Sequence, residues 1–559
     1  MKKLLLLMVL FIFSFGIFAA CSREVKVIFD FNYEGGPENQ EFILKKGQKV
    51  AELEVPEREG ATFFGWYNGQ ERWSFDKPVK KSMTLKANWD GDKIVEWYNL
   101  SQDATYLGGS VKIYFWHRMG AVNEQILQTF INGGTIDLGN NNIATEKVTV
   151  EGFNEWVKKE LGIEQSNIEI VAEKKPGSYP ELTQAVKMAL PVNGEPHLVE
   201  SYGDHVAAYA QSKKPLALNN FISNPNIGYS AEEIADFVPG YWNEGQLYDG
   251  AGTFLNLPGE GKSTEALFYN KTFFDLHGLT VPRTWEEIEV VARTIKQNAA
   301  AWGVPADSVP LGYDSEDNLF ITASEQKKIP YTGFDDIGKG KVLFNNQASK
   351  DMVSYFKGLV DEGLLTSKQL QGGQYTSDLF KAQKLFMSVG STGGTSYNVS
   401  PDFVTAVAPA PQFDLSNKKI IQQGPNINLF KKDNEQEMIA SFLFLKYLCD
   451  PTISSIWGSK TGYSPVRYSS YETDAWATYT AASQKAGASA ATKLIYDVLA
   501  MAKEEAPNFF TSPCFDRSSK TRDEVGSLLG TVFLAKETGQ ALLTLINNKF
   551  TTAYNAIMW

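Results

Sequence analysis

The sequence comprises 559 residues with a formal net charge of −12, and 43% of its residues are hydrophobic. The excess of acidic residues disfavours nucleic acid as a partner, because the phosphates would be repelled. The length exceeds what one hydrophobic core usually supports, so we expect two or more domains.

The N-terminal residues resemble a secretory leader. Lys2 and Lys3 precede an apolar run from Leu4 to Phe18, which is shorter than the ~20 residues of a membrane span. The following FAAC resembles a bacterial lipobox, although Phe18 stands where Leu is usual. The resemblance implies a signal peptide over residues 1–20, a lipidated N-terminus over 21–23 through Cys21, and anchoring on the extracellular face of the cell membrane. Simple cleavage after Ala20 is the alternative.

Cys449 and Cys514 are the other cysteines of the sequence. They could form one disulfide, but two separate buried thiols are favoured, since so large a fold does not need a single bridge. No cysteine and histidine spacing is typical of a zinc site. We therefore expect neither a metal nor a cofactor.

Residues 24–90 form a separate segment rich in strand and turn signals. Residues 25–31 and 83–89 alternate in polarity and carry β-branched and aromatic residues, as strands do. The order of turns and aromatic residues resembles one unit of the Listeria–Bacteroides repeat, a small β-rich module of surface proteins. Its expected core is Phe63, Trp66, Trp73, Phe75 and Trp89. A spacer role is favoured, with a wall or protein contact as the alternative.

Residues 91–109 lack periodicity and end in two glycines, so they are predicted to be a linker. Strand-like and helix-like segments then alternate, with strands expected at 111–117 and 168–173 and helices at 120–131 and 183–190. The polar, Gly- and Asn-rich residues 132–150 are expected to be a loop insertion. Such alternation predicts mostly parallel sheets covered on both faces.

Several later helices are also marked by local signals. Thr284 and Glu287 have the spacing of a capping box, and residues 349–362 form an amphipathic pattern stopped by Gly363. Residues 437–448 are nearly all apolar, which predicts a helix buried on most sides.

Residues 247–288 and at least five further segments, in order from about Val111 to about Leu534, resemble the bacterial extracellular solute-binding proteins of family 1. These proteins serve ABC importers of carbohydrates and glycerol phosphates. The resemblance implies an α/β, two-lobed periplasmic-binding-protein-like fold of type II over residues 110–559, preceded by the small β-rich module. It also implies capture of a ligand between closing lobes, delivery to ABC permease subunits in the membrane, and no catalysis. His197 replaces an Asp that is usual in the family.

Arg522 is the strongest candidate for a ligand contact. It precedes Val525 by three residues and Leu529 by seven, so it shares their apolar helix face. It is also expected in the first helical turn, where a cation is disfavoured without an anionic neighbour. A ligand phosphate or carboxylate could supply one, and an internal ion pair with Asp516 or Glu524 is the alternative. The glycerol-phosphate members of the family carry an Arg at the matching place.

The resemblance implies further ligand contacts by polar and aromatic side chains and by a glycine that permits close approach. These positions are Tyr179, Glu200, Ser263, Thr264, Ser391, Gly424 and Tyr463. Tyr241 and Trp242 could offer stacking surfaces for a sugar, but core packing is equally consistent with them.

The acidic residues Asp314, Glu316 and Asp317 favour a neutral ligand. They occupy a region where the glycerol-phosphate members carry a Trp, and they would repel a phosphate, whereas carboxylates accept readily from sugar hydroxyls. A neutral sugar or oligosaccharide and a glycerol phosphate both stay open. An extracellular glycan-active hydrolase or a surface adhesin are alternatives of other classes, and no GxSxG elbow or recognisable carboxylate pair supports an enzyme.

Overall fold

The computed structural model describes residues 24–33, 36–53, 63–68, 71–89, 94–335 and 339–558. The predicted signal peptide and the lipidation site Cys21 lie outside these residues. The chain separates into two compact units, Met1–Gly91 and Asp92–Trp559. Among the helices in the described ranges, none combines the length and the apolar character that crossing a membrane requires.

The first unit is a five-stranded sheet with its own core. Its central strands β1 and β5 run parallel, and the other neighbours run antiparallel. Trp66 and Trp89 are buried in the core, while Phe63, Trp73 and Phe75 pack partly exposed against it, which confirms the predicted core set. In spatial order the strands are β2 (Gln40–Lys45), β1 (Glu24–Asp30), β5 (Met83–Trp89), β3 (Phe63–Asn68) and β4 (Glu71–Arg72).

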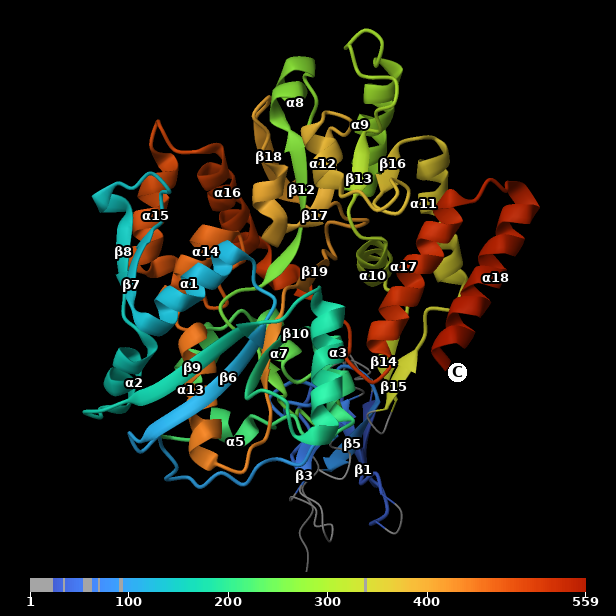
Figure 1. Ribbon diagram of the computed structural model, residues 1–559. Coiled ribbons are helices and arrows are strands. Elements are labelled where there is room, and N and C mark those ends of the chain that lie inside the picture. Colours follow the sequence, from blue (N-terminus) through green and yellow to red (C-terminus); the bar gives the residue numbers. More distant parts are fainter. Residues whose placement is uncertain are drawn as a thin grey trace, which may run out of the picture. The chain divides into compact units, whose positions relative to one another are not determined.

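The second unit contains two large sheets, visible in the lower and upper halves of Figure 1. The lower sheet has the parallel strands β10, β6 and β9 at one side and the antiparallel β20 at the other. Its strands in order are β11 (Asn256–Leu257), β20 (Asn426–Leu429), β10 (Leu198–Ser201), β6 (Ser110–His117) and β9 (Asn167–Lys174). The helices of this lobe are α1 (Ala121–Asn132), α2 (Phe153–Leu161), α3 (Tyr179–Ala189), α4 (Gly203–Ala210), α5 (Asn219–Ile222), α6 (Ala231–Asp236), α7 (Pro239–Glu244) and α13 (Glu435–Leu448).

The upper sheet belongs to the second lobe and is mixed. Its strands in order are β16 (Leu365–Ser367), β13 (Leu311–Tyr313), β17 (Met387–Ser391), β12 (Ser263–Asn270), β19 (Ile420–Gln423) and β21 (Phe509–Phe510), with β18 (Thr405–Pro409) also paired to β12. The helices of this lobe are α8 (Lys271–His277), α9 (Trp285–Gln297), α10 (Glu316–Gln326), α11 (Gln347–Asp361), α12 (Thr376–Lys381), α17 (Ser518–Leu534) and α18 (Gly539–Met558). The short strands β14 (Thr332–Phe334) and β15 (Gly340–Val342) pair with each other. Three more helices, α14 (Pro451–Thr461), α15 (Asp474–Gln484) and α16 (Ala490–Glu505), pack together.

The chain crosses between the lobes where a strand of one sheet leads directly into a strand of the other. One crossing is residues 258–262, between β11 and β12, and the second is residues 424–425, between β19 and β20. Each lobe is therefore assembled from separate stretches of chain. This is the two-lobed α/β fold of type II that the resemblance implied, with a small β-rich module before it.

Most predicted elements are present because their signals are local. Thr284 accepts from the backbone N–H of Glu287 and closes the capping box of α9, and α13 is buried on nearly all sides. The expected loop at 132–150 is wrong, since residues Gly134–Asp137 (β7) and Lys147–Val150 (β8) form an antiparallel hairpin. Cys449 and Cys514 are free and buried, as expected.

The segment predicted as a linker packs on the second unit over its described part. Val95 is buried with Val206 and Leu255, and the indole N–H of Trp97 donates to Thr253 Oγ1 at 3.2 Å. Residues 94–109 carry almost no regular structure, which explains why the sequence pattern resembles a linker.

Candidate functional site

A cavity of about 670 Å³ lies between the two lobes. Tyr179 of α3 and Asp204 of α4 line it from the first lobe, and Asp317 of α10, Gln423 of β19 and Arg522 of α17 line it from the second. A space of this volume with aromatic and polar walls suits a small polar ligand.

Tyr179 and Glu200 form a hydrogen-bonded pair at the cavity wall. Ser178 and Glu181 cap α3 and so fix Tyr179 at its first position. The Tyr179 hydroxyl donates to Glu200 Oε1 at 2.9 Å, and the Arg118 backbone N–H donates to Glu200 Oε2 at 2.6 Å. Burial raises the pKa of Glu200, although both hydrogen bonds oppose this rise. Tyr179 lines the cavity, and Glu200 lies behind it.

Arg522 lines the cavity as an ion-paired side chain. Its Nε lies 2.5 Å from Asp317 Oδ2, and its terminal N–H donates to Asn318 Oδ1. The partner is therefore Asp317, in place of the Asp516 or Glu524 considered from the sequence. Burial lowers the pKa of Arg522, but the nearby carboxylates, Asp317 foremost, outweigh burial and hold this pKa above its usual value. Helix α17 begins at Ser518, so Arg522 lies in its second turn and the expectation of a first-turn position is wrong.

The charged side chains that line the cavity show a slight acidic excess. Among its described lining residues, Asp204, Glu244, Asp317 and Asp523 outnumber the cations Lys187, Lys368 and Arg522. Burial lowers the pKa of His205 to about 4, so this imidazole is neutral at pH 7. Burial also raises the pKa of Asp204. The cavity thus has no cationic excess to offer an anion.

The other five predicted ligand residues gather at the crossing segments. Ser263 pairs with Gln423 and Thr264 with Gln422, where β12 meets β19. Gly424 has a φ of +92°, and a Cβ there would lie 3.0 Å from the Ser263 backbone nitrogen, so only glycine fits. Ser391 Oγ accepts from the backbone N–H of Gly393 at 3.2 Å, and the Tyr463 ring lies against Gly393.

These five positions do not line the cavity described above. Thr264 is buried, and its hydroxyl donates to the Ile421 carbonyl at 2.9 Å. Tyr241 and Trp242, the possible stacking surfaces, are also buried in the core. The structure thus brings Tyr179 and Arg522 to the cavity with Glu200 behind Tyr179, and brings the other five together at the crossing.

Sequence reasoning missed several residues that line the cavity. Asp204 and His205 lie shortly after β10, beyond the carboxyl end of a strand that runs parallel to its neighbour β6. Ligands of open α/β sheets bind beyond such strand ends, so this position was a usable signal. Gln422 and Gln423 end β19 immediately before the crossing at Gly424.

Known protein families match both parts of the chain. Residues 153–484 match the model of a family described as bacterial extracellular solute-binding protein, and residues 26–88 match that of the Listeria–Bacteroides repeat domain. The sn-glycerol-3-phosphate-binding periplasmic protein UgpB of Yersinia pestis bv. Antiqua (strain Antiqua) is 24% identical over 304 residues, which cover 53% of this chain and 67% of that protein.

Two solved structures illustrate the shared fold. UgpB from Mycobacterium tuberculosis, in complex with glycerophosphocholine, superposes with a TM-score of 0.57 at 14% identity, covering 81% of this chain and all of that one. The sugar-binding protein MalE from Xanthomonas citri superposes with a TM-score of 0.58 at 16% identity, covering 80% of this chain and 98% of that one. At such identities the likeness establishes the fold.

Proposed function

Because the chain belongs to the family of bacterial extracellular solute-binding proteins, we propose that it captures a neutral oligosaccharide between its lobes and delivers it unaltered to the permease of an ABC importer. Lobe closure on the ligand is the mechanism. The eight predicted ligand residues remain proposals, with Tyr179 and Arg522 favoured by their place in the cavity.

The engagement of Arg522 by Asp317 is the observation that carries the choice of a neutral ligand. A phosphate binds tightly to a guanidinium whose charge is not already compensated, and here Asp317 lies 2.5 Å from Arg522. Asp204 and Asp523 supply further carboxyl groups in the same cavity, whereas Glu244 is already paired with Lys262 Nζ at 2.7 Å. Carboxylate and amide oxygens accept from sugar hydroxyls, while the remaining N–H groups of Arg522 can donate to them.

A glycerol phosphate or its diester is the second candidate. It is favoured by the sequence relatives, which are sn-glycerol-3-phosphate-binding proteins, and by the presence of an Arg in the cavity. A phosphate could compete with Asp317 for Arg522. The two candidates therefore differ in whether the Arg522 charge is needed.

A thermal-shift screen of the purified protein separates these candidates. Maltose, maltotriose and longer oligosaccharides would be compared with sn-glycerol 3-phosphate and glycerophosphocholine, since a ligand that binds only the folded state raises the melting temperature. Stabilisation by an oligosaccharide, retained in the double variant Arg522→Gln/Asp317→Asn, supports the proposal. Stabilisation only by the phosphate compounds, abolished in that variant, favours the second candidate. Chromatography of the bound compound after incubation tests whether it leaves unaltered, and a cleaved product would indicate a hydrolase.

The proposed location is the extracellular face of the cell membrane, with Cys21 as the lipid anchor. Two acyl chains suffice for stable anchoring. Replacing Cys21 by Ser should release the protein from washed membranes into the medium, and a protein that stays in the membrane fraction would contradict the anchor. For the repeat module over residues 24–90 we propose a spacer role, with a wall or protein contact as the alternative.

A further inference from the structure

The side chain of Lys262 is completely buried at the first crossing segment, between β11 and β12. Its Nζ lies 2.7 Å from Glu244 Oε2 and donates to the Gly424 carbonyl at 2.7 Å. It also donates to Asn426 Oδ1 at 3.1 Å. Since Gly424 begins the second crossing and Asn426 begins β20, one ammonium group ties both crossings together.

The backbone of Lys262 connects a third segment to the same point. Its N–H donates to the Ser464 carbonyl at 3.0 Å, and the Ser464 N–H donates to the Lys262 carbonyl at 2.6 Å. Ser464 lies in the loop that follows α14. The arrangement fixes three chain segments at one residue.

Glu244 links this point to the ligand cavity. It is the last residue of α7 and lines the cavity. Its Oε2 accepts from Gln422 Nε2 at 3.0 Å as well as pairing with Lys262. Gln422 also lines the cavity and lies two positions before Gly424, where the second crossing begins. One carboxylate thus connects the cavity wall to the ammonium that holds both crossings.

The polar side chains around Lys262 have bonding capacity left over. Among the described residues, Gln422 Oε1 and Asn426 Nδ2 are buried without a hydrogen-bond partner. Buried polar groups are nearly always paired, so these atoms can take new partners when the crossings rotate. Such a polar hinge can exchange one set of hydrogen bonds for another, whereas a tightly interlocked apolar core resists stepwise change.

We propose that Lys262 is a positioning residue that couples the cavity wall to the hinge: with Glu244 it sets the angle between the two crossings and thereby the balance of open and closed lobes. The inference goes beyond the proposed function and does not depend on the identity of the ligand. Burying a charge pair costs desolvation free energy, and such a pair adds little stability over an apolar pair of similar size. Stability alone therefore does not account for the Lys262–Glu244 pair, whereas a positioning role does.

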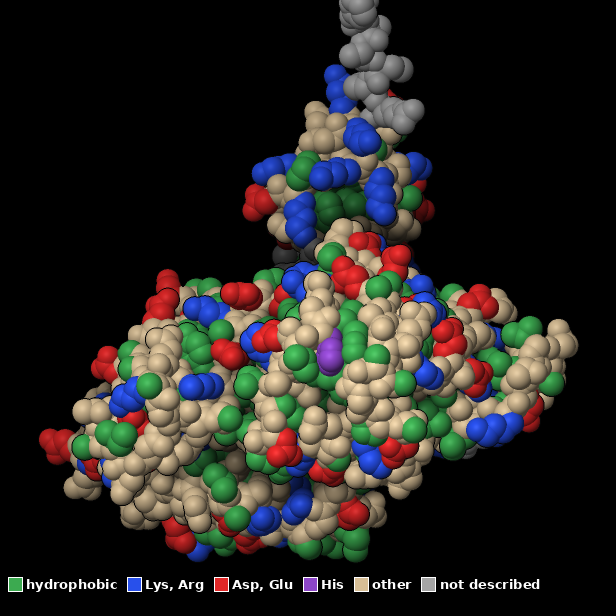
Figure 2. Space-filling model, turned by 90° about the horizontal axis from the view of Figure 1, so that it is seen from above, with side chains coloured by type: hydrophobic (Ala, Val, Ile, Leu, Met, Phe, Trp, Pro, Cys, Tyr) green, Lys and Arg blue, Asp and Glu red, His purple; other side chains and the backbone are tan. Residues whose placement is uncertain are grey.

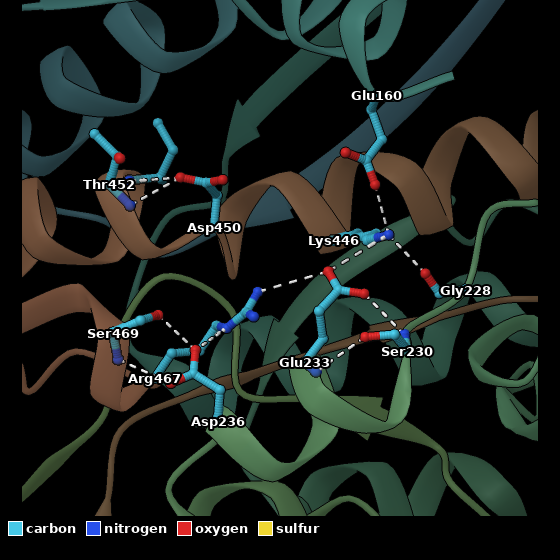
Figure 3. A network of polar contacts seen from close by, with 11 residues as sticks. Glu160, Gly228, Ser230, Glu233, Asp236, Lys446, Asp450, Thr452, Arg467 and Ser469 are labelled. Atoms are coloured by element: carbon cyan, nitrogen blue, oxygen red, sulfur yellow. Dashed lines mark hydrogen bonds and ion pairs between the residues drawn. The ribbon is translucent and has the colours of Figure 1, made fainter. Parts of the chain in front are cut away.

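Lys446 provides a matched control, because it is a buried lysine with similar contacts inside the first lobe. Its Nζ lies 2.7 Å from Glu160 Oε1 and donates to the Gly228 carbonyl at 2.6 Å. Figure 3 shows this group within a network that also includes Glu233, Arg467 and Asp236. Lys446→Met therefore removes a comparable buried cation without touching either crossing.

The test measures lobe separation in the ligand-free full-length mature protein that carries Cys21→Ser. Spin labels are placed at Met188→Cys on α3 and Leu276→Cys on α8, both of which are exposed residues, one on each lobe. A parent without introduced cysteines gives the background from the buried native thiols. Lys262→Met should shift or broaden the distance distribution, and hydrogen exchange at the backbone amides of residues 259–262, Gly424 and Asn426 should become about tenfold faster. Lys446→Met should change neither quantity, even if it lowers the melting temperature.

The double variant Lys262→Met/Glu244→Leu covers the case in which Lys262→Met does not fold. It leaves no unpaired buried charge, so folding should be retained, while the directional bonds to Gly424 and Asn426 are gone. An altered distance distribution in this variant supports the proposal. A distribution and an exchange pattern indistinguishable from those of the parent, in either folded Lys262 variant, would overturn it.

Discussion

Arg522 Nε and Asp317 Oδ2 lie 2.5 Å apart across the junction of α17 and α10. Asp317 stands in the first turn of α10, where the helix dipole favours a negative charge. The pair is partly buried, with 24% of the Arg522 side chain and 27% of the Asp317 side chain exposed. It therefore joins two helices of the second lobe and at the same time determines the charge that the cavity presents.

Loss of one member of this pair should destabilise the second unit. Asp317→Asn leaves the Arg522 guanidinium poorly compensated in a partly buried site, and we expect a loss of about 1–3 kcal/mol in the free energy of unfolding. Urea denaturation measures this change. Asp378→Asn is the control, because the Asp378–Lys381 pair is largely exposed and should contribute no more than about 0.5 kcal/mol. Equal effects of the two substitutions would contradict the structural role of Asp317.

Thr264 should contribute to stability more than to ligand affinity in the conformation described. Thr264→Val removes the hydrogen bond to the Ile421 carbonyl, which should cost about 1–2 kcal/mol. The dissociation constant of the stabilising ligand, measured by calorimetry well below the melting temperature, should stay within about twofold of the parent value. Ser324→Ala, which removes a similar buried hydroxyl-to-carbonyl bond in α10, should behave alike. A tenfold loss of affinity in Thr264→Val but not in Ser324→Ala would instead support the direct ligand contact that the family resemblance implies.

Glu265 should make the protein less stable as the pH rises through the neutral range. Burial raises the pKa of Glu265 to about 7, even though the hydrogen bond from the Tyr313 hydroxyl opposes this rise. The ordinary value is 4.5, so the folded state binds more protons than the unfolded state between these two values. Stability contributed by the neutral carboxyl is complete below pH 4.5 and is lost as the pH approaches and passes 7.

Glu265→Gln should remove this dependence by keeping the group neutral at every pH. We expect little change in the free energy of unfolding at pH 4.5 and a gain of roughly 2–3 kcal/mol at pH 8 relative to the parent. Chemical denaturation across this range measures the difference, and Glu96→Gln, at an exposed position, serves as the control. A constant difference between parent and variant at all pH values would show that Glu265 does not titrate in this window. Glu260, whose pKa burial raises to about 8, should leave a residual slope in both proteins.

Helices and strands could be predicted from the sequence where their signals are local. The ion pairs of the candidate site could not be predicted in this way. The capping box at Thr284 lies within a few residues of the apolar pattern of α9, so sequence alone defines that helix. The hairpin at 132–150 was missed because its two strands are only four residues long each, and the Gly- and Asn-rich stretch between them dominates the local pattern. Asp317 is 205 positions before Arg522, and Asp516 and Glu524 are near it, so a single sequence favours the wrong partners.

The surface charge illustrates the same limit of composition. A net charge of −12 disfavours nucleic acid as a partner but does not show where the charges lie on the fold. On the face shown in Figure 2, acidic and basic side chains are interspersed over the surface. Asp204, Asp317 and Asp523 line the cavity together, although they are far apart in the sequence.

The boundary of the solute-binding unit should lie before residue 94 and not at Ser110. Tyr98 donates its hydroxyl to Glu435 at 3.0 Å and accepts at its backbone carbonyl from Asn220 Nδ2 at 2.6 Å, and Val95 is buried. A chain that begins at Asp92 should therefore keep the melting temperature and the ligand affinity of the second unit. A chain that begins at Ser110 exposes the surfaces that Val95 and Trp97 cover and should lose about 3 kcal/mol or more. Calorimetry of both chains decides the question: equal melting temperatures would make residues 94–109 a linker after all.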